Sequence, residues 1–436
     1  MANETTAASG APGAPENSPS TRKTSLGLVF VIVFIDLLGF AIVLPLLPRY
    51  ASRLHASDST IGLLFASFSA MQFIFSPLWG RLSDRIGRRP ALLAGLAGSV
   101  VFYTLFGLAS VWESLTLMFV ARIGAGIAGA TISTAQAYIA DATGLQGRAK
   151  GMALIGAAFG VGFTFGPIIG ALSLAKRPEA GGVDTLNAFP MYLAAGLSGI
   201  AFIVAFFKLP ESLRAGAAPA HRTWLNVGAI REAMRVPSVG QLLLLFFLAT
   251  FAFAQFESTL SRLTEVAFKR SAEDNFYIFS YIGLTLCFMQ GVVVRRLVTK
   301  VGEPLMIIIG TVLMGTGLWL VSIAAEQQSF RMLLWLMPIL VGGFSFVTPS
   351  VQALISRRSD PSRQGEILGV NQSAASMARI FGPWLGNVLF GHGYVLPYQV
   401  ATALIVPALI MSIFTASAGQ DWQPASSAEL KPSEPA

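Results

Sequence analysis

Charged residues are scarce in this sequence, and their scarcity excludes an ordinary soluble protein. Only 12% of the 436 residues are Asp, Glu, Lys or Arg, whereas 54% are hydrophobic, and a soluble domain is about one quarter charged. The chain has one cysteine, Cys287, so it has neither a disulfide framework nor a cysteine metal site. Its three histidines lack metal-ligand spacing. The sequence therefore predicts no enzyme activity, no metal and no cofactor.

Two further classes of protein are disfavoured by what the chain lacks. It has no phosphate-binding P-loop, which argues against an ATP-driven pump. Its formal net charge is +8, but the basic residues are spread over short connections rather than gathered on one face. We therefore expect no nucleic-acid partner.

Long apolar runs are what the sequence has in abundance. A helix needs about 20 residues to cross a hydrocarbon core of roughly 30 Å, and runs of that length recur along nearly the whole chain. Because no water reaches the bilayer centre, each crossing must satisfy its own backbone hydrogen bonds, which helices do. We predict an all-α membrane protein with twelve transmembrane helices, at residues 26–48, 59–79, 90–110, 113–138, 149–173, 188–208, 238–262, 275–294, 304–324, 331–354, 365–390 and 394–418.

The basic residues indicate how the chain is oriented in the membrane. If the N-terminus is cytoplasmic, the inside segments hold 20 of the 30 Lys and Arg and the outside segments hold eight. That imbalance follows the positive-inside rule. We therefore expect a multi-pass protein of the plasma membrane, the inner membrane of a bacterial cell, with both termini in the cytoplasm.

The polar stretches divide the chain into two bundles. Residues 1–24 and 419–436 are polar and low in complexity, so we expect disordered cytoplasmic tails. A longer polar stretch, residues 209–237, predicts a central cytoplasmic linker between six-helix bundles at 25–208 and 238–418.

The two predicted bundles carry the same marker residues at an offset of 215 or 216. Such an offset indicates two parallel six-helix repeats, which in transporters rock around a central binding site. The matching pairs are Leu82 with Leu297, Arg85 with Lys300, Gly87 with Gly302, Gln136 with Gln352, Gly166 with Gly382, Pro167 with Pro383 and Gly170 with Gly386.

The connection between the second and third spans holds one acid among four arginines. It reads GRLSDRIGRRP from Gly80 to Pro90. Its carboxylate, Asp84, could form charge-assisted hydrogen bonds or cap a helix of the other bundle, and so latch one conformation. The alternative is a basic loop that only sets topology. The residues assigned to the latch are Gly80, Asp84, Arg85, Gly87, Arg88, Arg89 and Asp141.

This connection resembles the G-x-x-x-D-R-x-G-R-R signature of the major facilitator superfamily. The resemblance covers residues 26–418 and implies the fold of that superfamily and transport of a small molecule. Arg122 and Gly126 in the fourth span are similar to the R-x-x-x-G pattern of the same superfamily.

The first and fifth spans resemble one branch of the superfamily, the drug/proton antiporters. Gly162, Gly166, Pro167 and Gly170 match the pattern G-x-x-x-G-P-x-x-G, although close helix packing alone could explain small residues there. The Asp36-Leu37-Leu38-Gly39 stretch is similar to tetracycline-efflux antiporters. The resemblance implies export of a small organic molecule or drug in exchange for protons, and we expect the protein to be a monomer.

Two features separate the chain from the bacterial tetracycline pumps. Its eighth span has no histidine and its ninth has no acid, so tetracycline itself is not implied as the substrate. Residues 257–264, with Ala378 and Arg379, resemble instead a eukaryotic tetracycline-transporter-like branch associated with organic anions.

Four ionisable residues interrupt the predicted spans: Asp36, Arg122, Glu257 and Arg379. Insertion scales assign roughly 2.5 to 3.5 kcal/mol to a charged group at the helix centre, so such groups normally face a partner or a wet cavity. Asp36 and Arg122 both lie near mid-bilayer, and a buried carboxyl beside an arginine can exchange a proton. We therefore assign proton coupling to this pair.

Alternatives remain open for each of these residues. Asp36 and Arg122 could be a permanent salt bridge that only locks two helices, and Glu257 with Arg379 could be structural or contact the substrate. The polar cavity candidates could be interhelical hydrogen-bond partners. The residues assigned to the substrate cavity are Gln136, Gln255, Glu257, Tyr281, Gln352 and Arg379.

Two other functions remain alternatives to proton antiport. An importer or uniporter, for example of an organic anion or metabolite, could use the same fold. A membrane receptor built on a carrier scaffold would bind a ligand without transporting it.

Overall fold

The computed structural model describes residues 19–175, 187–213, 231, 237–359 and 364–418, and of residues 19–25, 144–153, 175, 237, 364–366 and 417–418 the backbone alone. Within these ranges the secondary structure is helical, as predicted. The predicted tails and linker lie largely outside them, so the disorder of the tails and the bounds of the linker stay predictions. The elements are α1 (Pro19–Arg53), α2 (Asp58–Ile86), α3 (Arg88–Val111), α4 (Leu115–Gly129), α5 (Ile132–Ala175), α6 (Phe189–Lys208), α8 (Pro237–Phe268), α9 (Ala272–Phe288), the π-helix η1 (Met289–Val294), α10 (Arg295–Val301), α11 (Glu303–Glu326), α12 (Phe330–Arg358), α13 (Gln364–His392) and α14 (Leu396–Ala418).

These helices confirm the prediction of twelve membrane-crossing segments. Eleven segments of the described chain are long and apolar enough to cross a membrane. The twelfth crossing is α13, whose 29 residues are sufficient in length, although Asn371, Gln372, Arg379 and Asn387 make it more polar. Large apolar side chains such as Trp335 and Phe207 are 81% and 78% exposed, as expected of surfaces that face lipid.

The fourth crossing differs from the prediction because it is a broken helix. It consists of α4 and the first part of α5, separated by a turn at Ala130 and Thr131. A broken helix within a bilayer needs other partners for its freed backbone groups. Side chains of α2 supply two of them, since Trp79 Nε1 donates to the Ile127 carbonyl at 2.7 Å and Gln72 Nε2 donates to the Gly129 carbonyl at 3.2 Å.

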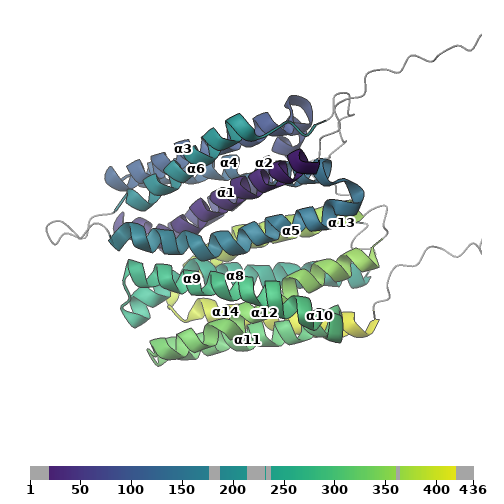
Figure 1. The fold of residues 1–436 in the computed structure, drawn as a ribbon. Coiled ribbons are helices and arrows are strands. Elements are labelled where there is room, and N and C mark those ends of the chain that lie inside the picture. Colours follow the sequence, from purple (N-terminus) through teal and green to yellow (C-terminus); the bar gives the residue numbers. More distant parts are fainter. Residues whose placement is uncertain (1–18, 176–186, 214–230, 232–236, 360–363, 419–436) are drawn as a thin grey trace, which may run out of the picture.

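Figure 1 shows the helices in two layers, α1–α6 in one and α8–α14 in the other. The two layers form one unit because α5 packs on α9, α2 on α13 and α1 on α8. The first helix begins and the last helix ends at the same end of the bundle, as an even number of crossings requires (Figure 1). These are the two six-helix repeats that the sequence offset predicts.

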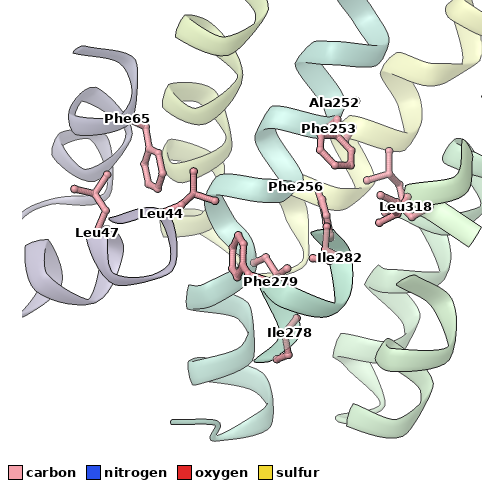
Figure 2. Packing of buried hydrophobic residues seen from close by; sticks show 14 of the residues in the cluster. Leu44, Leu47, Phe65, Ala252, Phe253, Phe256, Ile278, Phe279, Ile282 and Leu318 are labelled. Atoms are coloured by element: carbon pink, nitrogen blue, oxygen red, sulfur yellow. The ribbon is translucent and has the colours of Figure 1, made fainter. Parts of the chain in front are cut away.

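We name the two ends of the bundle by their connections. The basic end carries the connection from Gly80 to Pro90 and its repeat before α11, and the Asp58 end is the opposite end, where α2 begins. A buried apolar cluster continues across the two layers, and Figure 2 shows Leu44 and Phe65 of the first layer beside Phe279 of the second. The layers are therefore packed together through a shared core.

Candidate functional site

Asp36 lies on α1 against α3, in the first half of the molecule. Ser99 Oγ donates a hydrogen bond of 3.0 Å to its carboxylate, and the Tyr103 hydroxyl donates one of 3.3 Å to its backbone carbonyl. The approach is close because Gly39 lies against the Tyr103 ring, where a Cβ would be 2.7 Å from ring atoms. The hydrogen bonds from α3 and the close approach at Gly39 thus hold the carboxylate between two helices of one repeat.

A small cavity of about 10 Å³ adjoins Asp36, and its lining includes Gly95 and Thr131. That volume is enough for about one water molecule. The turn that breaks the fourth crossing lies beside the same carboxylate, since a Cβ on Gly129 would be 3.7 Å from Asp36 Oδ2. The break thus places irregular backbone next to the buried acid. Irregular backbone is not tolerated where it faces lipid, but it is tolerated where it is buried in protein or lines a cavity.

Arg122 lies on α4 and is 3% exposed, but the structure does not bring it into an ion pair with Asp36. Its Nε donates to the Leu64 carbonyl at 3.3 Å, and its guanidinium lies 4.5 Å from the centre of the Phe68 ring and 5.9 Å from that of Phe40. The cation is stabilised by aromatic rings instead of a carboxylate. The sequence-based pairing, as a permanent salt bridge, is therefore not present in this conformation.

A second cavity, of about 30 Å³, lies between the two halves and brings together three of the four charges. Arg122 comes from the first half, and Glu257 of α8 and Arg379 of α13 come from the second. Glu257 and Arg379 interact electrostatically. The other residues that line the cavity are Phe40, Leu44, Phe65, Ser69, Ala254, Ser258 and Pro383.

This second cavity is small in the present conformation. Its volume suits water and not an organic molecule, which needs a pocket of roughly 300 Å³ or more. The aromatic residues Phe40 and Phe65 and the hydroxyl of Ser69 were not predicted from the sequence. Apolar residues in an apolar span carry no signal of which face points at a cavity.

The uncharged cavity candidates do not line this second cavity. Gln255 is fully buried, and neither polar atom of its amide has a hydrogen-bond partner among the described residues. Tyr281 is half-buried, and Gln136 and Gln352 are exposed. Only Glu257 and Arg379 of the predicted set are therefore brought together there.

The latch residues at the basic end form a network within the first half. Arg88 pairs with Asp84 at 2.5 Å and with Asp141 at 3.1 Å, and it donates to Ser83 Oγ at 2.7 Å. The predicted cap by Asp84 on a helix of the other half is not present in this conformation. Its second oxygen, Oδ2, is buried and has no partner among the described residues.

Glu211, which follows α6, is the carboxylate that caps a helix at this end, and the helix belongs to its own half. Its carboxylate accepts hydrogen bonds from the backbone N–H groups of Arg88 at 2.8 Å and Arg89 at 3.1 Å, at the N-terminus of α3. Gly87 has φ of +104° and lies against this carboxylate, so a side chain there would be strained and would clash. Of the other latch residues, Gly80 is buried, Arg85 is exposed, and Arg89 donates to the Phe206 carbonyl at 2.5 Å.

The glycines of the antiporter-like pattern lie at helix contacts in α5. A Cβ on Gly162 would be 3.1 Å from Leu37 Cβ, and one on Gly166 would be 2.7 Å from Ala41 Cβ, both on α1. Gly170 lies against the Phe276 ring of α9, in the other half. Pro167 lies inside the helix. The pattern therefore permits close packing both within one half and between the halves.

The ion pairs between described residues differ at the two ends of the molecule. At the basic end, Arg88 pairs within the first half, and Arg357 pairs with Glu303 within the second. At the Asp58 end, Arg262 of α8 pairs with Asp58 of α2 across the halves.

Comparisons with known proteins agree with this architecture. The chain is 30% identical over 402 residues to the class E tetracycline resistance protein of Escherichia coli, covering 89% of this chain and 94% of that protein. It is 27% identical to multidrug resistance protein 2 of Bacillus subtilis (strain 168), covering 90% and 96% of the two chains. The crystal structure of the human organic anion transporter MFSD10 (TETRAN) superposes with a TM-score of 0.63 at 25% identity, covering 90% and 99%.

The family model described as Major Facilitator Superfamily matches residues 29–383, and a second match covers residues 291–435. The first match alone spans most of the chain, with nearly all of the first half and most of the second. This multi-pass membrane protein, with its two repeats and its charged cavity between them, belongs to the Major Facilitator Superfamily.

Proposed function

We propose that this protein is a proton-coupled antiporter that exports a small organic molecule across the plasma membrane as a monomer. The observation that carries the proposal is the separation of two buried sites. Asp36 adjoins a cavity within the first half, whereas Arg122, Glu257 and Arg379 line a cavity between the halves. An acid apart from the substrate cavity can bind a proton without occupying the place of the substrate.

The arrangement of contacts supports alternating access. The halves are joined by an ion pair at the Asp58 end, and exposed glutamines lie toward the basic end at Gln136 and Gln352. An amide exposed within a membrane span is tolerated where water reaches it. With the basic end in the cytoplasm, as the positive-inside rule predicts, this conformation is open to the cytoplasm and closed to the outside.

In the proposed cycle Asp36 carries the coupling proton. Its carboxyl group binds a proton when the protein is open to the outside and releases it when the protein is open to the cytoplasm. The substrate crosses on the opposite stroke. Each proton that enters gains about 2.3 kcal/mol per 100 mV of membrane potential, which can drive the export of substrate.

The experiment that tests this function is an accumulation screen in cells that lack their own efflux pumps. Cells with the wild-type protein should accumulate less of a transported compound, and collapse of the proton gradient or the change Asp36→Asn should abolish the difference. Ser99→Ala is the matched control because it removes a donor to Asp36 but keeps the carboxyl group. Export by a well-expressed Asp36→Asn protein at the wild-type level would refute the coupling role.

A second candidate is transport of organic anions, favoured by the charge of the cavity between the halves. Two arginines and one glutamate leave one excess positive charge there, and the similar human protein MFSD10 is titled an organic anion transporter. Arg379→Gln should then reduce transport of an anionic dye at least tenfold, since one buried charge-assisted contact is worth about 1.5 to 3 kcal/mol. Arg331→Gln, at an exposed position, should leave transport unchanged.

A further inference from the structure

Arg262 of α8 makes a set of contacts at the Asp58 end that joins three helices. Its guanidinium forms an ion pair with Asp58 of α2, donates to Asn387 Oδ1 of α13 at 3.2 Å, and lies 4.3 Å from the centre of the Phe390 ring, also of α13. Asn387 is itself held, since its amide donates to the Pro383 carbonyl at 2.9 Å. The arginine is therefore fixed on the second half and presented to one acid of the first half.

The helices around this ion pair pack unusually closely. A Cβ on Gly62 of α2 would lie 2.7 Å from the Trp384 backbone of α13, and one on Gly391 would lie 3.2 Å from Asp58 Cβ. The side chains of Arg262 and Asp58 are only 15% and 36% exposed. Opening this end would thus separate two partly buried charges as well as a tight helix contact.

The second repeat has an acid at the position that corresponds to Asp58, but this acid contacts its own helix and not the other half. Glu273 lies 215 residues later, at the start of α9, and is exposed. It accepts a hydrogen bond of 3.3 Å from Tyr277 of the same helix. Of these two acids, Asp58 of the first repeat pairs with an arginine of the other half, whereas Glu273 of the second repeat contacts its own helix. The contact is therefore not repeated by the pseudo-symmetry of the molecule.

We infer that Arg262 and Asp58, supported by Asn387, form a latch that keeps the Asp58 end closed and must break for substrate to pass there. The inference rests on the alternating access proposed above. The basic-end network of Arg88, Asp84 and Asp141 stays within one half in this same conformation. Among the ion pairs of the described residues, the one at the Asp58 end joins the two halves, whereas those at the basic end lie within one half.

Cysteine labelling of the full-length protein in right-side-out membrane vesicles, with a membrane-impermeant maleimide added only to the Asp58 side, tests the latch at that end. In a Cys287→Ser background, Leu44→Cys places a thiol at the contact between the halves, where the native residue is 4% exposed. Asp58→Asn or Arg262→Gln should raise its rate of reaction with a polar maleimide about tenfold, as a shift of roughly 1.4 kcal/mol in a two-state equilibrium would do. Glu273→Gln is the matched control and should change nothing.

Exchange of the two charges, Asp58→Arg with Arg262→Asp, should restore slow labelling. An unchanged labelling rate in the folded single variants would refute the proposed role of Arg262 and Asp58 as a latch. An equal increase of the labelling rate with Glu273→Gln would refute it as well. This readout needs no substrate and no proton gradient, so the latch can fail while proton-coupled export holds.

A cross-link provides a second measurement that does not depend on the single variants. In the double variant Asp58→Cys with Gly391→Cys, the two Cβ atoms would be about 3.2 Å apart, near the roughly 3.5 to 4.5 Å of a disulfide. Oxidation should stop transport of the compound found by the accumulation screen, and a reductant should restore it. Undiminished transport by the oxidised protein would show that this end does not open.

Discussion

Individual glycines of this protein differ in how closely other helices pack against them. Gly166 lies at the contact of α5 with α1, where a Cβ would be 2.7 Å from Ala41 Cβ and 2.8 Å from the Leu38 carbonyl oxygen. At Gly196 of α6, no described atom beyond the backbone of its own helix lies within 4 Å of the place that a Cβ would take. The first glycine is required for close approach of two helices, and the second is not.

Gly166→Ala should therefore destabilise the protein by about 1 to 3 kcal/mol, as overpacking in a tight contact does. Gly196→Ala should be neutral or should stabilise the helix by roughly 0.5 to 1 kcal/mol. Thermal unfolding in detergent, monitored by size-exclusion chromatography, measures the stability of both variants. Equal stabilities of the two variants would mean that α5 packs on α1 more loosely than the short contacts of Gly166 require.

At the residue scale, the sequence shows which charges lie within the apolar spans but not how they pair. Asp36, Arg122, Glu257 and Arg379 are conspicuous because a charge in an apolar span is costly. Equal depth suggests that Asp36 and Arg122 meet, yet Arg122 turns toward the rings of Phe40 and Phe68. Depth follows from counting residues, whereas the direction of a side chain depends on the rotation of its helix.

At the scale of an element, the broken fourth crossing is the feature that most distinguishes the structure from the prediction. The turn at Ala130 and Thr131 lies between α4 and α5, beside Asp36. Glycines in this apolar run permit a break but do not require one. The partners that stabilise it, Trp79 and Gln72, lie on α2 and are distant in sequence.

Trp79→Phe removes the hydrogen bond to the Ile127 carbonyl while keeping an aromatic ring. We expect a loss of about 1 kcal/mol, because the Ile127 carbonyl keeps only the longer hydrogen bond of 3.4 Å from the Ala130 N–H. The same substitution at Trp335, which is 81% exposed, should have little effect. Thermal unfolding of both variants decides the matter, and a Trp79→Phe protein as stable as Trp335→Phe would contradict the role assigned to α2.

Glu211 shows a second limit of prediction at this scale. The carboxylate lies 123 residues after the Arg88 backbone N–H that it caps, and it follows α6 at the start of the polar stretch. Local sequence patterns identify caps within a few residues of a helix end. A cap supplied from another part of the chain is visible only once the helices are assembled.

For the whole molecule, the sequence predicts the architecture because the same signals, apolar runs and marker residues, recur along the chain. Twelve apolar runs and markers offset by 215 or 216 residues lead directly to two six-helix repeats. The conformation is a different matter, since one sequence supports states that differ by only a few kcal/mol. Which end is closed became visible only through contacts such as Arg262 with Asp58.

The central claim, that proton movement through Asp36 drives export, is tested most directly with purified protein in proteoliposomes. An imposed proton gradient should drive uphill movement of the transported compound together with a change in internal pH, and Asp36→Asn should abolish both. Uphill transport that persists without a gradient or potential, or in a correctly folded Asp36→Asn protein, would contradict the account.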